Sequence, residues 1–147
     1  MKLRTLLPVI GLILILALAG CGGTQGGSSL EANNSATVGV DLETLPDSVD
    51  VQTVNGLMND PEVFLIDVRE PYEYEAGHIP GITLIPMGDV ASRLNEIPTD
   101  KEVIITCRSG NRSGQVADYL RAQGFTNVHN MEGGILAWEA AGFEVEQ

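Results

Sequence analysis

The chain has 147 residues, 44% of them hydrophobic, which is enough for one domain with a hydrophobic core. Lys2 and Arg4 are two of its eight cations, so the residues after position 20 carry six cations against all twenty acidic side chains, a net charge of −14. A body this acidic repels phosphate backbones and anionic lipid headgroups, so its composition argues against nucleic-acid binding.

Residues 1–20 have the pattern of a signal peptide for export. Lys2 and Arg4 make a short basic start, a mostly aliphatic run extends from Leu6 to Leu18, and small residues end the segment. The run is shorter than the roughly 20 apolar residues that a membrane-spanning helix needs. We therefore predict a cleaved signal peptide, with an uncleaved membrane span as the alternative.

The end of this segment, Leu18-Ala19-Gly20-Cys21, resembles the lipobox of bacterial lipoproteins. The resemblance implies that Cys21 becomes the new N-terminus and carries fatty acyl chains on its sulfur and usually its amine. Residues 21–37 are rich in Gly, Ser and Asn, which is typical of a flexible tether. We expect an extracytoplasmic protein, lipid-anchored to a bacterial membrane. An ordinary cleaved signal peptide is the alternative.

Strand and helix patterns alternate through residues 38–147, which we expect to form the folded domain. Short β-branched apolar runs predict strands at 63–66 and 103–106, with weaker ones at 84–85, at 128 and at 49–51. Helices are predicted at 52–59, 71–75, 89–95, 113–123 and 135–141, most of them bounded by Pro or Gly. This alternation predicts a single three-layer α/β domain, with a parallel sheet of about five strands flanked by helices.

Cys107 directly follows the 103–106 strand, at the edge of a parallel sheet where ligands bind. It has no disulfide partner once Cys21 is acylated. The next helix start, a backbone turn at Gly110 and two arginines should each favour its thiolate. A buried structural cysteine is the alternative. The candidate loop consists of Cys107, Arg108, Ser109, Gly110, Asn111 and Arg112.

Four segments in fixed order carry a family resemblance: residues 66–70, residues 75–81, the Cys107 loop, and Gly133-Gly134 with Trp138. They resemble the rhodanese family, the thiosulfate-type sulfurtransferases, over about residues 49–143. The resemblance implies that Cys107 takes a sulfane sulfur from a small anionic donor as a persulfide and passes it to cyanide, a thiol or a partner protein. The loop amides, Arg108 and Arg112 would steady the persulfide and the leaving sulfite. No cofactor is implied.

Two other functions remain open for the same loop. Cysteine-dependent phosphatases need an arginine six residues after the nucleophile, whereas here Arg112 is five residues after Cys107 and Ser113 takes the sixth position. The shorter loop favours sulfur over a tetrahedral phosphate or arsenate as the cargo, so a phosphatase or arsenate reductase is the weaker alternative. The loop also suits a persulfide carrier that holds sulfur for a partner, with little turnover of small donors.

Polar residues outside the loop are expected to support it. Asp67, at a strand end, should bond neighbouring loops, and Arg69 should pair with an acid, while Glu73 suits the positive end of a helix dipole. No metal site is expected, since one short helix cannot easily bring these carboxylates together. Gly133-Gly134 should form a tight turn beside the active loop. His129 is predicted to lie at the surface, at a strand end.

Overall fold

The computed structural model describes residues 40–147. The expected signal peptide at 1–20, the expected lipidation site Cys21 and the predicted tether at 21–37 lie outside these residues. Within the described part of the chain, no helix is both long enough and apolar enough to span a membrane.

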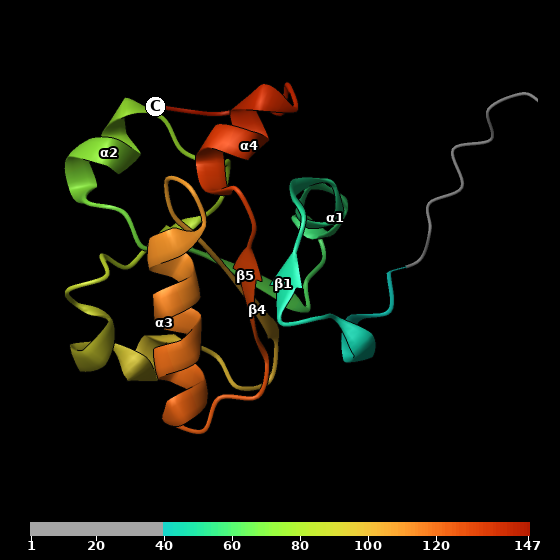
Figure 1. Ribbon diagram of the computed structural model, residues 1–147, viewed down its shortest axis with the longest axis vertical. Helices are drawn as coiled ribbons and strands as arrows, with labels where there is room; N and C mark the ends of the chain where they lie inside the picture. The colour runs from blue at the N-terminus through green and yellow to red at the C-terminus, as the bar shows by residue number, and fades with distance from the viewer. Residues whose placement is uncertain (1–39) are drawn as a thin grey trace, which may run out of the picture. The chain divides into compact units, whose positions relative to one another are not determined.

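Five strands form one parallel sheet in the order β1-β5-β4-β2-β3. β4 is the central strand and pairs with β2 and β5 (Figure 1). The segment that follows β4 therefore leaves from the middle of the side of the sheet where all the strands have their carboxyl ends. The predicted α/β domain with a five-stranded parallel sheet is confirmed. The strands are β1 (Ser48–Val49), β2 (Val63–Asp67), β3 (Thr83–Leu84), β4 (Glu102–Thr106) and β5 (Val128–Met131).

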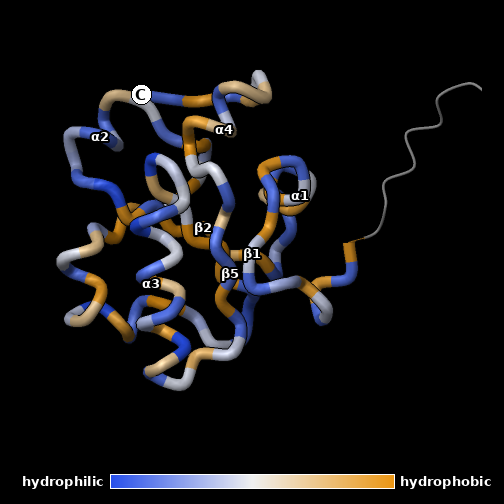
Figure 2. Tube along the Cα trace, viewed as in Figure 1, coloured by the Kyte–Doolittle hydropathy of each residue, from blue (hydrophilic) through white to orange (hydrophobic). Residues whose placement is uncertain are grey.

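Helices cover both faces of the sheet, and hydrophobic residues are concentrated along the central strands (Figure 2). Val103 and Ile105 of β4 pack with α3 on one face, whereas Ile104 packs with α1 and α4 on the other. This alternation places Cys107, two residues after Ile105, in the α3 cluster. The helices are α1 (Val51–Leu57), α2 (Pro71–Ala76), α3 (Asn111–Ala122) and α4 (Gly134–Ala140).

The predicted helix at 89–95 is wrong. The segment forms two separate 3-10 turns, η2 (Val90–Ser92) and η3 (Leu94–Glu96), closed by i to i+3 bonds such as Ile97 N–H to Leu94 C=O at 3.2 Å. The helical backbone is interrupted at Arg93, whose φ of −118° and ψ of 21° separate the two turns, and Pro98 keeps Ile97 extended after the second turn. The predicted apolar face survives, since Val90 and Ile97 are both buried.

Two further predictions need correction. The strand predicted at 49–51 ends at Val49, because the Asp50 carboxylate accepts the Thr53 N–H at 2.8 Å and begins α1 at Val51. His129 is buried at 5% exposure instead of lying at the surface. Its two ring nitrogens contact the Pro46 carbonyl at 2.6 Å and the Glu102 carboxylate at 2.7 Å.

Candidate active site

Cys107 lies in the turn between β4 and α3, and its side chain is 1% exposed. Its Sγ accepts hydrogen bonds from the Gly110 N–H at 3.2 Å and the Ser113 hydroxyl at 3.3 Å. Gly110 has a φ of +88°, a left-handed conformation that curls the loop so that its amides face the sulfur. The amino end of α3 therefore surrounds the sulfur with donors.

These donors lower the pKa of Cys107. Burial by itself raises the pKa of the thiol, but hydrogen bonds from the Ser113 hydroxyl and from the backbone N–H groups of Ser113, Ser109 and Gly110 outweigh it. The result is a pKa below that of an ordinary cysteine. Hydrogen bonds are the largest causes that lower this pKa, and the Arg112 charge also interacts favourably with the thiolate. The thiolate is the reactive form of cysteine.

The two loop arginines have different surroundings. Arg112 donates from both terminal nitrogens to the Glu73 carboxylate, at 2.7 Å each, so its guanidinium is held by α2. Arg108 is exposed and makes no side-chain hydrogen bond or ion pair with another described residue. Arg108 is therefore the loop arginine that is available to an anionic ligand.

The remaining loop side chains, those of Ser109 and Asn111, are exposed. The Asn111 side-chain oxygen accepts a hydrogen bond from the Gln115 side chain at 2.7 Å. It is therefore bonded along α3 and not to the Cys107 sulfur. Ser109 contributes its backbone N–H to the Cys107 thiolate. The loop thus acts on the sulfur mainly through its backbone.

Asp67 and Arg69 form a buried ion pair behind the loop, at 2.7 Å. Arg69 also donates to the Glu73 carbonyl at 3.1 Å and the Gly77 carbonyl at 2.8 Å. The ion pair agrees with the expectation that Arg69 pairs with an acid, whereas the bonds to neighbouring segments are made by Arg69 and not by the Asp67 side chain. Since Glu73 binds Arg112 in turn, this pair connects the end of β2 to the start of α3 through α2.

The Glu73–Arg112 contact should make stability depend on acid pH. The hydrogen bonds from Arg112 lower the pKa of Glu73 to about 2, so the contact stabilises the fold above the ordinary carboxyl pKa and is lost as pH falls toward 2. The full shift corresponds to about 3 kcal/mol, which partial exposure of the pair reduces to about 1–2 kcal/mol. Urea unfolding between pH 6 and pH 3 should therefore show a flatter pH dependence for Glu73→Gln.

The matched control is Glu75→Gln on the same helix, since Glu75 makes no ion pair with a described residue. This variant should lose as much stability on acidification as the parent. Parallel curves for the parent and Glu73→Gln would contradict the assignment.

The start of α4 packs directly against the back of the loop. The Ile135 N–H donates to the Cys107 carbonyl at 2.9 Å, and the Leu136 N–H donates to the Arg108 carbonyl at 3.2 Å. Gly133 and Gly134 both have positive φ and make the turn that allows this approach. The tight Gly133-Gly134 turn expected beside the loop is thus present.

A groove of about 290 Å³ borders the loop between α2 and α4. Arg108 lines it, with the exposed side chains of Tyr72 on α2 and Leu136 on α4. A small anion entering this groove would meet the Arg108 guanidinium next to the loop backbone.

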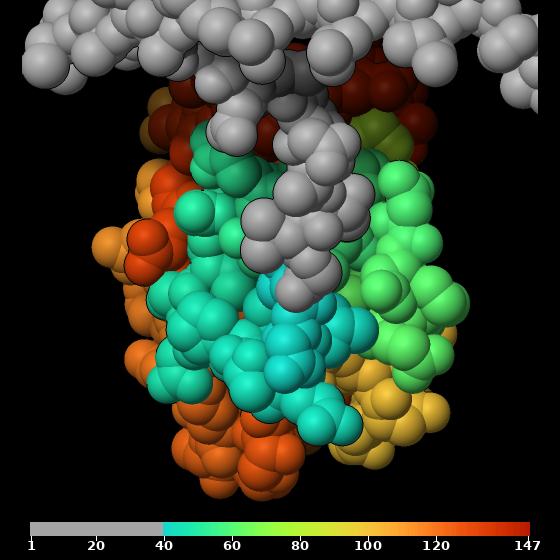
Figure 3. Space-filling model, turned by 90° about the vertical axis from the view of Figure 1, so that its right-hand side faces the viewer, coloured from blue at the N-terminus to red at the C-terminus, as the bar shows by residue number. Residues whose placement is uncertain are grey.

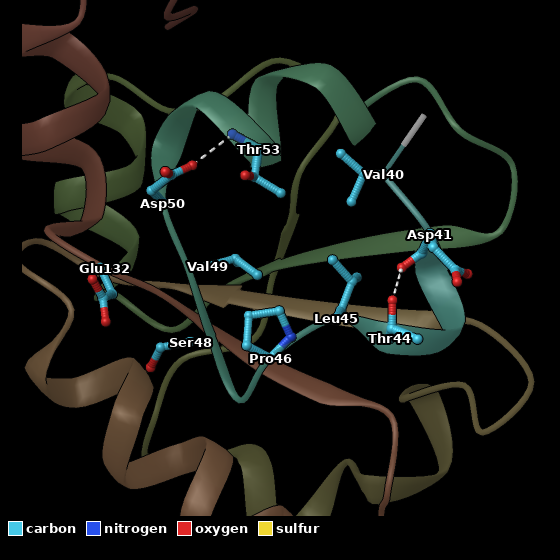
Figure 4. A pocket seen from close by; sticks show the side chains of 10 residues that line it. All are labelled: Val40, Asp41, Thr44, Leu45, Pro46, Ser48, Val49, Asp50, Thr53 and Glu132. Carbon is cyan, nitrogen blue, oxygen red and sulfur yellow. Dashed lines mark hydrogen bonds between the residues drawn. The ribbon is translucent and has the colours of Figure 1, made fainter. Parts of the chain in front are cut away.

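A separate hollow of about 340 Å³ lies between η1 (Leu42–Thr44), β1 and the start of α1 (Figure 4). The segment that starts at Val40, cyan in Figure 3, lies at the surface there. The hollow's Asp50 and Asp41 carboxylates already accept neighbouring backbone N–H groups. None of the described residues lining it is a cysteine, histidine or basic residue, so the candidate chemistry lies at Cys107.

Sequence reasoning missed three contributors to the site: the Ser113 hydroxyl, the Glu73 carboxylate as the Arg112 partner, and Asn130 next to Ser113. The sequence signal that could have identified Ser113 is a serine in the first turn of the helix that follows the cysteine loop.

Among residues 40–147, no group of three or more His, Cys, Asp or Glu side chains is arranged to hold a metal.

Comparisons with known proteins agree with the fold. The family model of the Rhodanese-like domain matches residues 50–141. A sulfurtransferase of Allochromatium vinosum is 41% identical over 98 residues, covering 66% of this chain and 92% of that protein. A thiosulfate sulfurtransferase of Pseudoalteromonas translucida is 41% identical over 85 residues, covering 58% and 81%.

A putative sulfur carrier protein of Bacillus subtilis is 37% identical over 114 residues, which cover 78% of this chain and 57% of that protein. Among solved structures, a rhodanese-like domain protein from Staphylococcus aureus superposes with a TM-score of 0.61 at 32% identity. That match covers 69% of this chain and 100% of the other.

Proposed function

The chain belongs to the rhodanese-like domain family, and on that premise we propose that it is a sulfurtransferase acting through a persulfide on Cys107. It moves a sulfane sulfur from thiosulfate or a persulfide donor to a thiophilic acceptor, which is cyanide, a thiol or a partner protein. The observation that carries the proposal is the set of hydrogen bonds to Cys107 Sγ from Gly110 and Ser113, which favour the thiolate.

The reaction consists of two displacements at sulfur. In the first, Cys107 Sγ attacks the sulfane sulfur of thiosulfate, and the donor S–S bond breaks with its electron pair leaving on sulfite. In the second, the acceptor attacks the outer sulfur and Sγ leaves as the thiolate. Arg108 is positioned to attract the donor, whereas Arg112, held by Glu73, maintains the loop geometry.

The proposal is tested on purified residues 38–147. They should form thiocyanate from thiosulfate and cyanide, and should gain about 32 Da, one sulfur atom, when given thiosulfate alone. Absence of both products would contradict the proposal. Phosphomonoester hydrolysis in their place would instead favour the phosphatase alternative.

A second candidate function is a persulfide carrier with little turnover of small donors. Its support is the relative named a putative sulfur carrier protein, which is 37% identical to this chain. A stable gain of about 32 Da on Cys107, together with poor thiosulfate turnover, would select this function.

We also propose that the protein acts outside the cytoplasm, held to a membrane by lipid on Cys21. The support is the sequence Leu18-Ala19-Gly20-Cys21 and the Gly- and Ser-rich segment at 21–37 that follows it. Bacteria that express the full chain and are fed labelled palmitate should label the parent but not Cys21→Ser. Equal labelling of both chains, or of neither, would contradict a lipid anchor at this residue.

A further inference from the structure

The Ser113 hydroxyl lies between two groups that can accept its proton. Its oxygen is 3.3 Å from Cys107 Sγ and 2.6 Å from Oδ1 of Asn130, and the Ser113 side chain is fully buried. A hydroxyl has a single proton, so Ser113 can donate to only one of these groups at a time. Asn130, on β5, therefore influences whether that proton is available to the sulfur.

Which of these two acceptors the Ser113 hydroxyl donates to depends on the charge of Cys107. While Cys107 is a thiol, its S–H can donate to Ser113 Oγ, and Ser113 can donate onward to Asn130 Oδ1. Once solvent has taken the thiol proton, the thiolate needs a donor, and the Ser113 O–H must turn toward Sγ. The Ser113 and Asn130 oxygens would then face each other at 2.6 Å with no proton between them.

An amide can relieve this conflict because it carries an acceptor and a donor on the same carbon. Turning the Asn130 side chain over presents Nδ2–H to Ser113 Oγ. The Asn130 side chain makes no other hydrogen bond with a described residue, and no buried side-chain nitrogen or oxygen among those residues lacks a partner. Nδ2 is therefore reached by solvent, and turning the amide breaks no other protein hydrogen bond.

We propose that Asn130 is a positioning residue that acts through Ser113: it accepts the Ser113 proton while Cys107 is a thiol, and turns to donate to Ser113 once Cys107 is a thiolate. In the second state the chain of donors runs from Asn130 Nδ2 to Ser113 Oγ to Cys107 Sγ. Hydrogen bonds in such a chain polarise one another, so the bond from Asn130 to Ser113 strengthens the bond from Ser113 to Cys107. This role concerns ionisation of the thiol and does not require that the protein transfer sulfur.

The test measures the alkylation rate of Cys107 by iodoacetamide across pH in the full chain, with the Cys107 peptide read by mass spectrometry so that Cys21 does not contribute. Asn130→Ala should raise the midpoint of the profile by about half a unit, so that at any pH well below the midpoint alkylation slows roughly threefold. Ser113→Ala should raise the midpoint by about one unit. In the Ser113→Ala background, Asn130→Ala should change nothing further.

Asn130→Asp is the second variant, because it keeps the size of the side chain. Its carboxylate can only accept, so it should hold the Ser113 proton away from the sulfur, and its negative charge also opposes the thiolate. Together these effects should slow alkylation below the midpoint about tenfold. The charged groups around the loop are Arg112 with Glu73, Arg108 with Glu139 across the groove, Asp67 with Arg69, and Glu132 beside Gly110. All of them remain in every variant, so the differences among the alanine variants do not come from them.

The direction in which Asn130→Ala shifts the midpoint distinguishes an Asn130 that turns from one that only accepts. If Asn130 only withdrew the Ser113 proton, Asn130→Ala would free that proton for Sγ and lower the midpoint, which overturns the proposal. An unchanged midpoint overturns it too. An equal rise in the Ser113→Ala background would show that Asn130 acts without Ser113, and this also overturns it.

Discussion

Replacing Cys107 by serine is expected to reduce thiocyanate formation from thiosulfate and cyanide by at least about a thousandfold. The donors around Sγ stabilise a thiolate, but they are too weak to ionise a serine hydroxyl at neutral pH. The substitution should leave the fold intact, because an oxygen in the same position can accept from Gly110 and Ser113. The steady-state rate and the intact mass after thiosulfate treatment measure the effect.

The matched control is the same substitution at the other cysteine. Cys21→Ser in the full chain should keep the parent rate and the mass gain of about 32 Da, since persulfide chemistry is assigned to Cys107 alone. The assignment would fail if Cys107→Ser kept either the turnover or the added sulfur. It would also fail if Cys21→Ser lost them.

The loop could be located from the sequence because its components are consecutive. A short buried strand, Cys107, Gly110 and a helix start follow one another, so local rules place the backbone amides around the sulfur. The structure bears out this arrangement. The amides and the Ser113 hydroxyl are the largest causes that lower the thiol pKa, and the predicted charge interaction is present for Arg112.

The supporting contacts could not be predicted because they join residues that are distant in sequence. Glu73 and Arg112 are 39 positions apart, and Ser113 and Asn130 are 17 positions apart. Helix-dipole reasoning explained Glu73 within α2 but had no means to detect a partner on α3. A long-range pair of this kind becomes visible only when the register of β2, β4 and β5 is known.

The fold was predictable where one local signal dominated. β2 and β4 are continuous apolar runs, and Pro71 and Gly124 mark helix boundaries that the structure retains. The segment at 89–95 was harder, because an apolar spacing of this kind also fits two successive 3-10 turns. There the backbone leaves the helical region at Arg93, inside the predicted helix, and the apolar spacing carries no signal for that break.

Replacing Gly134 by alanine is expected to lower turnover about a hundredfold and to destabilise the fold by about 3 kcal/mol. Gly134 has a φ of +58°, and an added Cβ would overlap the Cys107 carbonyl and lie 2.6 Å from both the Arg108 carbonyl carbon and the Ser109 nitrogen. All three are backbone atoms of the active loop, so either the loop or α4 must move. Such a shift would weaken the hydrogen bond from Ile135 to Cys107 and misdirect the loop amides.

Gly142→Ala separates this clash from the effect of backbone conformation alone. Gly142 also has a positive φ, +78°, but nothing lies within 4 Å of a Cβ placed there. The control should therefore cost only about 1–2 kcal/mol of backbone strain and keep the parent turnover. Thermal unfolding and the thiocyanate assay on both variants measure the two effects separately. If Gly134→Ala matched Gly142→Ala in both measurements, close packing of α4 against the loop could not be what holds the loop amides around Cys107.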